Sequence, residues 1–141
     1  MADPSKVDEA VVAKLEAASA LMAIFTDGVF FDLAPAAATK FVIVSLVIAG
    51  DEDVFGETDA GMQTPLYLVK AVEKSTDDSN VKSGAALIHT ALQKQALTIT
   101  GYSHMATRRV ERVRYTEVDD DSDIRWQHQG GRYEVMVSSN G

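Results

Sequence analysis

The run FVIVSLVIA, residues 41–49, constrains the fold more than any other feature, because apolar side chains occupy both alternate sets of positions. β-branched residues dominate the run, and only Ser45 interrupts it. Successive side chains of a strand point to opposite faces of a sheet, so both faces of this strand are apolar. We therefore expect a central strand that is covered on both faces, by its own domain or, on one face, by a partner molecule.

The length and composition are those of one folded domain. The chain has 141 residues, which is enough for one core and too few to favour two, so we expect a single α+β domain over residues 1–141. It contains no cysteine, which excludes disulfides, thiolate metal sites and cysteine nucleophiles. The N-terminus lacks a basic region followed by an apolar block, and residues 41–49 fall short of the roughly 20 residues that cross a bilayer. We expect a soluble protein made in the cytoplasm, without a membrane partner.

Apolar periodicity and turn residues divide the chain into helices and strands. The first predicted helix begins after Asp3 and ends near Gly28, and the second begins at Asp78 or Ser79. Strands are predicted over residues 29–34, 40–50 and 64–74. Another strand ends at about Thr100, a long one then continues through Tyr115, and a hairpin of 124–129 and 132–139 turns at Gly130 and Gly131. We expect an α+β fold with two helices packed on a largely antiparallel sheet of about five to six strands, in the order α-β-β-β-α-β-β-β.

Small and alternating residues predict where the layers of this fold meet. Gly84 and Ala85 would let the second helix approach the sheet closely. One buried face of the sheet is expected to carry three apolar sets, each of a single parity: Val113 and Tyr115, Ile124 and Trp126, and Tyr133, Val135 and Val137.

The formal net charge of -8 is distributed unevenly. Ten of the 21 acids lie in residues 51–59 and 117–123, whereas all six arginines lie at or beyond residue 108. A net negative charge argues against broad binding to nucleic-acid phosphate. In the stretch RRVERVR, residues 108–114, strand alternation places Arg108, Arg112 and Arg114 on one face and Arg109 on the other. These arginines either decorate an exposed face or contact acidic segments of an adjacent copy.

The sequence favours neither a metal site nor an enzyme. The histidines His89, His104 and His128 fall on separate predicted elements without the i, i+4 spacing of a metal site. There is no G-x-S-x-G, P-loop or G-x-G-x-x-G motif. We expect no catalytic residues, no metal and no cofactor. A metal-assisted hydrolase built around two histidines is the weakest of the alternatives.

The stretch DDDSD invites comparison with a calcium-binding loop. Its alternating aspartates match the first three ligand positions of such a loop, but Ile124 stands where the sharp-turn Gly belongs and Gly130 where the bidentate Glu belongs. A solvated hairpin turn is therefore the favoured interpretation over weak cation binding.

The order of these elements resembles a family of tail-completion proteins of long-tailed bacteriophages, the group that includes tail terminators. The resemblance covers nearly the whole chain and lies in DGVFFDLAP at the end of the first helix, ATKFVIVSLV, TPLYLVKAVEKSTD, NVKSGAALIHTALQ, LTITGYSHMATRRVERVRY and the closing IRWQHQGGRYEVMV. Thr39 and Lys40 stand where the family usually has a proline before its first long strand.

The resemblance implies a structural virion protein and no enzymatic activity. Such a subunit forms a ring, six-fold in the family, at the head-proximal end of the tail tube, where it ends tube polymerisation and presents the joining surface for the head or neck. Its partners would be further copies of itself, the tail tube protein and a head-completion or neck protein, and DNA would pass through without specific binding. The alternatives are a head-completion or neck protein, or a stand-alone α+β module that binds a ligand or protein.

Three sets of residues are candidates for contacts in such an assembly. A carboxylate-lined wall would repel the phosphates of passing DNA, and an acidic loop with apolar residues could dock on the tube or neck. The subunit-contact candidates are Arg108, Arg109, Arg112 and Arg114; the tube or neck loop would use Asp51, Asp53, Val54, Phe55, Glu57 and Asp59; the lumen or acidic turn would use Asp119, Asp120, Asp121 and Asp123.

Overall fold

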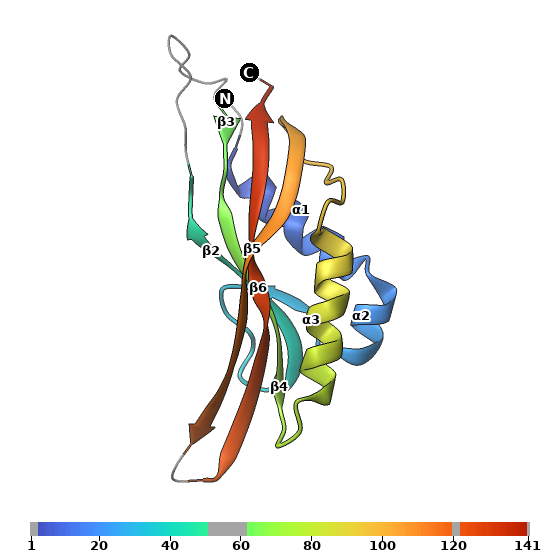
Figure 1. Ribbon diagram of the computed structural model, residues 1–141, viewed down its shortest axis with the longest axis vertical. Coiled ribbons are helices and arrows are strands. Elements are labelled where there is room, and N and C mark those ends of the chain that lie inside the picture. The colour runs from blue at the N-terminus through green and yellow to red at the C-terminus, as the bar shows by residue number, and fades with distance from the viewer. Residues whose placement is uncertain (1–2, 51–61, 120–121, 141) are drawn as a thin grey trace.

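The computed structural model describes residues 3–50, 62–119 and 122–140. Within these residues, three helices lie on one face of a six-stranded sheet (Figure 1). The helices are α1 (Ser5–Glu16), α2 (Ser19–Ile24) and α3 (Ser79–Leu92); the strands are β1 (Val29–Phe31), β2 (Lys40–Ile48), β3 (Met62–Gln63), β4 (Leu66–Lys74), β5 (Tyr102–Asp119) and β6 (Ile124–Ser139). The predicted α+β class is confirmed.

The sheet is mixed, and β6 lies at its centre. Strands β1, β2, β4 and β6 are neighbours in that order, β3 pairs with the C-terminal end of β6, and β5 pairs along the other side of β6. The β1–β2 pair is parallel and every other strand pair among the described residues is antiparallel, as predicted. Strands β1 and β5 are therefore the two edges of the sheet.

The first half of β2 is covered on both faces. Val42 and Val44 are fully buried in the main core beneath the helices. Phe41 points to the opposite face, where it packs with Val72 and Trp126 in a smaller cluster. The last residues of the strand, 46–48, are exposed. The chain's own side chains thus supply the cover that this apolar strand requires only over its first half.

The first predicted helix is divided in two at Ala17 and Ala18. Ala18 leaves the helical conformation with a ψ of 90°, although neither alanine is a helix breaker. The break shifts the phase of the apolar side chains, so that Leu21 and Phe25 are fully buried, whereas Met22 is only partly buried. Tertiary packing overrides local propensity here, and the described residues contain three helices instead of two.

The predicted turn at Gly130 and Gly131 is wrong, because β6 runs through both residues without a break. A Cβ atom at Gly130 would lie 2.0 Å from the carbonyl oxygen of Val69, so glycine is needed where β4 and β6 approach closely. The hairpin instead joins β5 to β6, with Asp119 opposite Ile124. In an unbroken strand, residues seven apart lie on opposite faces, and this is why Trp126 does not share the helix-covered face with Tyr133.

Two further strand predictions are corrected. The stretch to Thr100 forms only an isolated bridge, between Ile99 and Tyr102. The predicted strand over residues 64–74 is interrupted at Pro65, which has no N–H to donate to a ladder, so that β3 and β4 are separate. The Pro65 carbonyl accepts a hydrogen bond of 3.0 Å from the Val135 N–H, which holds the interruption against β6.

The packing of α3 on the sheet depends on Gly84, as predicted. A Cβ atom at this position would lie 2.4 Å from Cε2 of Phe25 and 2.8 Å from Cβ of Ala71. Gly84→Val should lower the free energy of unfolding by about 1–3 kcal/mol through overpacking, as measured by urea denaturation. Ser83→Val is the matched control on the exposed side of the same helix and should cost less than about 0.5 kcal/mol. Equal losses in the two variants would contradict this account.

Candidate functional site

A bulge in β5 decides which face each arginine occupies. The register of β5 against β6 shifts between Arg109 and Glu111, so that Val110 is an extra residue in the ladder. As a result Arg109 lies opposite Tyr133 and Arg112 lies opposite Gly131, both on the helix-covered face. The predicted division was therefore wrong: Arg109, Arg112 and Arg114 share this face, and Arg108 lies on the other, opposite Glu134.

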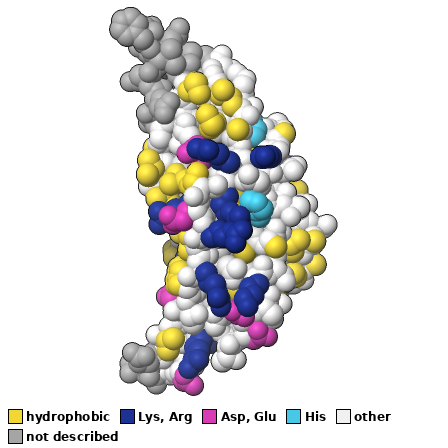
Figure 2. Space-filling view, in the orientation of Figure 1, with side chains coloured by type: hydrophobic (Ala, Val, Ile, Leu, Met, Phe, Trp, Pro, Cys, Tyr) yellow, Lys and Arg dark blue, Asp and Glu magenta, His cyan; other side chains and the backbone are white. Residues whose placement is uncertain are grey.

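The three arginines on the helix-covered face line a groove between α3 and β5. Its volume is about 690 Å³, and α3 contributes Lys82 and His89 to its walls. We call this site the arginine groove and define it by Lys82, His89, Arg109, Arg112 and Arg114. In Figure 2, Lys and Arg side chains form a column along the middle of the view, with His side chains beside them. A positive groove on an acidic chain suits a carboxylate or another anion.

The pKa of His89 is lowered by its position in the arginine groove. Burial lowers the pKa of its imidazole, and the nearby guanidinium groups of Arg109 and Arg112 lower it further. Burial raises the pKa of Tyr133, against a smaller opposing effect of Arg109. The Tyr133 hydroxyl lies 3.1 Å from His89 Nδ1, so the phenol can donate to the neutral ring and leave Nε2 as the donor.

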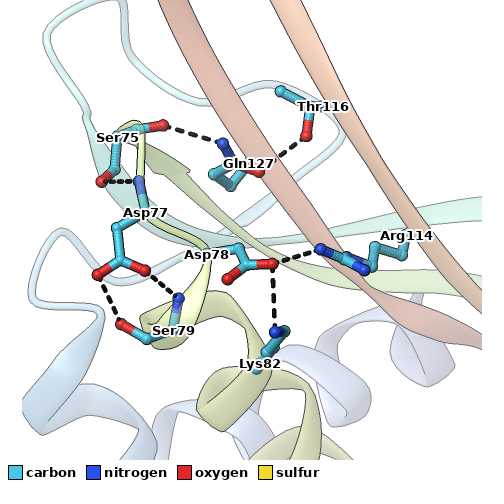
Figure 3. Close-up of polar contacts among 8 residues, drawn as sticks. All are labelled: Ser75, Asp77, Asp78, Ser79, Lys82, Arg114, Thr116 and Gln127. Atoms are coloured by element: carbon cyan, nitrogen blue, oxygen red, sulfur yellow. Dashed lines mark hydrogen bonds and ion pairs between the residues drawn. The ribbon is translucent and has the colours of Figure 1, made fainter.

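Asp78 compensates one end of the arginine groove. Its carboxylate pairs with Arg114 and, at 3.4 Å, with Lys82, as Figure 3 shows. The preceding residue, Asp77, accepts a hydrogen bond of 2.9 Å from the Ser79 N–H, just before the first turn of α3. Arg109 and Arg112 have no carboxylate partner within 4.0 Å among residues 3–50, 62–119 and 122–140. The middle of the groove thus carries uncompensated positive charge.

Side-chain hydrogen bonds also fasten the β5–β6 hairpin to the end of β4. The Gln127 side chain donates to the carbonyl of Ser75 at 3.1 Å and accepts from the Thr116 hydroxyl at 2.8 Å (Figure 3). The hairpin is therefore held against the body of the domain on the same side as the Asp78 pairs.

The opposite face of the sheet, by contrast, has matched charges. Arg108 Nε lies 3.2 Å from Glu134, and Arg132 Nε lies 3.5 Å from Glu111. Arg108 is thus already paired within its own chain, whereas Arg112 has no carboxylate partner among the described residues.

His128 lies within a stack of polar and aromatic groups on this matched face. It stacks on Tyr115 with ring centroids 4.3 Å apart and contacts Glu117. Lys70 lies 4.8 Å from the centroid of the Tyr115 ring. Burial lowers the pKa of His128, and the positive charge of Lys70 lowers it further by a smaller amount. The carboxylate of Glu117 opposes this shift. The three histidines have separate partners, and no three potential metal ligands gather among the residues that the structure describes.

The structure describes only some of the acidic residues that were predicted to form contacts in an assembly. Asp119 and Asp123 lie at the β5–β6 turn, where the Asp123 N–H donates to the Asp119 carbonyl at 2.9 Å. The predicted tube or neck loop, residues 51–59, lies outside the described residues, as do Asp120 and Asp121. Of the helices that the structure describes, none is long and apolar enough to span a bilayer.

A second groove, between α1 and β1, was not predicted. Its volume is about 450 Å³, and its lining includes half-buried Val12 and Phe31 together with Asp8, Glu9 and Glu16. We call it the acidic groove and define it by these five residues. The sequence did carry a signal, because Glu9, Val12 and Glu16 are spaced i, i+3, i+7 and so share one face of a helix.

Asp8 of the acidic groove is half-buried. It accepts a hydrogen bond from the Tyr67 hydroxyl. Burial raises its pKa, and the nearby carboxylates of Asp32, Asp3 and Glu9 add to that effect, while the bond from Tyr67 opposes it.

The class of protein defined by this geometry is an α+β domain with helices on one face of a mixed sheet and oppositely charged grooves near the two sheet edges. No protein-family model matches the chain, and neither does any curated protein. Among solved structures, the chain is similar to one from the virion of a native gene transfer agent particle. That chain superposes with a TM-score of 0.69 at 16% identity, over 94% of this chain and 95% of its own length. Another solved chain, whose name states no function, has a TM-score of 0.54 at 15% identity with the same coverage.

The surroundings of His104 at the start of β5 predict a pH dependence. The Leu97 N–H donates to His104 Nδ1 at 3.3 Å, so the neutral ring carries its proton on Nε2, 2.7 Å from the Thr107 hydroxyl. Burial lowers the pKa of His104 from its usual 6.5, against a smaller opposing effect of the Ala106 backbone. Because the folded pKa lies below the unfolded one, this contribution to stability is present above 6.5 and is lost as pH falls from 6.5 through the folded pKa.

The test is urea unfolding of the wild type and His104→Asn between about pH 7.5 and pH 5.5, a window centred on the ordinary histidine pKa. The wild type should lose stability as pH falls. His104→Asn should be less stable at the upper pH and should show a shallower dependence on pH. A variant with the wild-type slope would show that His104 does not supply this proton linkage.

Proposed function

We propose that the protein is a structural component of a phage-like virion, a tail terminator that forms a ring at the head-proximal end of the tail tube. It would end tube polymerisation there and present the joining surface for the head or neck. The observation that carries the proposal is the fold likeness over 94% of the chain to a chain of a gene transfer agent virion. A tail-end position agrees with the resemblance in sequence order to tail-completion proteins.

The charge distribution supports assembly by ring formation. A closed ring needs a heterologous interface, in which one patch of a subunit meets a different patch of the next. Arg112 is exposed and has no carboxylate partner within its own described residues, which suits a contact made by a neighbouring subunit. Of the four predicted subunit-contact arginines, Arg109 and Arg112 are therefore the stronger candidates, whereas Arg108 and Arg114 already have partners. We adopt the six-fold symmetry that the family resemblance implies.

The acidic residues would serve the passage of DNA and the contact with the tube. In this proposal Asp119, Asp120, Asp121 and Asp123 face the lumen, where their carboxylates repel phosphate. The segment of residues 51–59 would dock on the tube or the neck. The protein would act through surface complementarity, with no catalytic residue and no cofactor.

A head-completion or neck protein of the same virion region is the second candidate. The name of the similar solved chain specifies a virion and no position within it. Both proposed roles require the protein to form a ring. They differ in the length of the tail tube that is made when the protein is missing.

Electron microscopy of particles assembled without this protein distinguishes the two candidates. Overlong tubes are expected if the protein terminates the tail. Tails of normal length that fail to join heads would point to the neck role instead. Mass photometry of the purified protein, alone and with tube protein, should detect a ring. A strictly monomeric protein that leaves tube length unchanged on addition would contradict both roles.

A further inference from the structure

We propose that the arginine groove of one subunit binds the acidic groove of the next, so that the α3–β5 side of each subunit meets the α1–β1 side of its neighbour. The inference rests on the proposed ring and names the two surfaces that would close it. It commits to a second copy of this chain as the occupant of the arginine groove.

The positions of the two grooves suit a ring. Strands β1 and β5 are the opposite edges of one sheet, and each groove lies beside one of these edges, between that strand and a helix. Two different patches at opposite edges let every subunit contact one neighbour on each side. Identical patches would instead give a closed two-fold dimer.

The charges of the two grooves are complementary. In the arginine groove, Asp78 is the only carboxylate paired with a lining cation among the described residues, and it leaves Arg109 and Arg112 unmatched. In the acidic groove, Lys6 pairs with Glu9 at 3.2 Å, while exposed Glu16 has no ion pair within the described part of the chain. Each groove therefore has surplus charge that the other can neutralise.

The chemistry of the acidic groove fits an arginine side chain in particular. Half-buried Val12 and Phe31 give the groove an apolar lining, and exposed Glu9 and Glu16 supply carboxylates. The aliphatic stem of an arginine can lie along such apolar side chains while its planar guanidinium donates to the carboxylates. Arg112 is the most suitable donor, because it is exposed, unpaired and projects from an edge strand.

Charge-reversal variants test the pairing directly. Arg112→Glu and Glu16→Arg should each weaken ring formation by at least about tenfold in the concentration required, as measured by mass photometry. The combined variant should return to within about threefold of the wild type, because opposite charges face each other again. Arg108→Glu is the matched control on the same strand and should leave assembly unchanged, since Arg108 lies on the other face of the sheet. Urea midpoints of all four variants establish that each is folded.

The outcomes separate this inference from the proposed function. If the wild type forms rings and both single reversals do so equally well, the groove pairing is overturned while the ring role stands. If both singles fail and the combined variant also fails, the two residues do not face each other, and the pairing is again overturned. If the wild type forms no ring with tube protein, the proposed function falls, and this inference falls with it. If Arg112→Glu abolishes binding to a DNA duplex but leaves the rings intact, the groove is a phosphate site and the pairing is overturned.

Discussion

The pairing of β6 along both of its edges is the constraint on which the rest of the structure depends. This strand pairs with β3 and β4 on one side and with β5 on the other, over almost its whole length. Such an interior strand satisfies its backbone groups only if its neighbours can approach closely on both sides. Gly130 makes that approach possible, and the buried row Tyr133, Val135 and Val137 then gives the helices a flat apolar surface to cover.

The bulge at Val110 gives the two faces of the sheet different electrostatic properties. Without the extra residue, Arg112 and Arg114 would share the open face with Arg108 and Glu134, and Glu111 would turn toward the helices. With it, both guanidinium groups turn toward α3, where Arg114 pairs with Asp78 and Arg112 has no carboxylate partner among the described residues. A one-residue irregularity therefore decides whether Arg112 lies on the open face or in the arginine groove.

The fold class could be predicted from the sequence, but the path of the chain could only partly be predicted. Strong local signals held: the apolar run of β2, the small residue Gly84 in α3 and the acidic turn before Ile124. The errors arose where a residue type has two physical meanings. Paired glycines can form a turn or permit close strand packing, and only the neighbouring strands decide between them. Likewise, no local signal around Ala17 announces a helix break whose cause is the burial of Leu21.

The candidate site was predictable in composition and not in arrangement. The cluster of arginines is evident in the sequence, yet strand alternation assigns the wrong faces because a bulge adds one residue to the count. His89 and Lys82 join the arginines only through the packing of α3, far away in sequence. The acidic groove was not predicted, because its lining combines Phe31 of β1 with acidic residues of α1 that are distant in sequence. Such sites are properties of the topology, which local patterns do not encode.

The outer edge of β5 is paired over only part of its length. Near the start of β5 this edge is occupied, because the Lys94 backbone N–H donates to the Thr107 carbonyl and the Arg109 backbone N–H donates to Oε1 of the Gln93 side chain. From Val110 to Val118 it pairs with no other strand of the described chain, and an open strand edge is a template for indiscriminate aggregation. The guanidinium groups of Arg112 and Arg114 lie along this open stretch and hold identical edges apart by like-charge repulsion. The charge that marks the arginine groove thus protects the open edge from indiscriminate pairing.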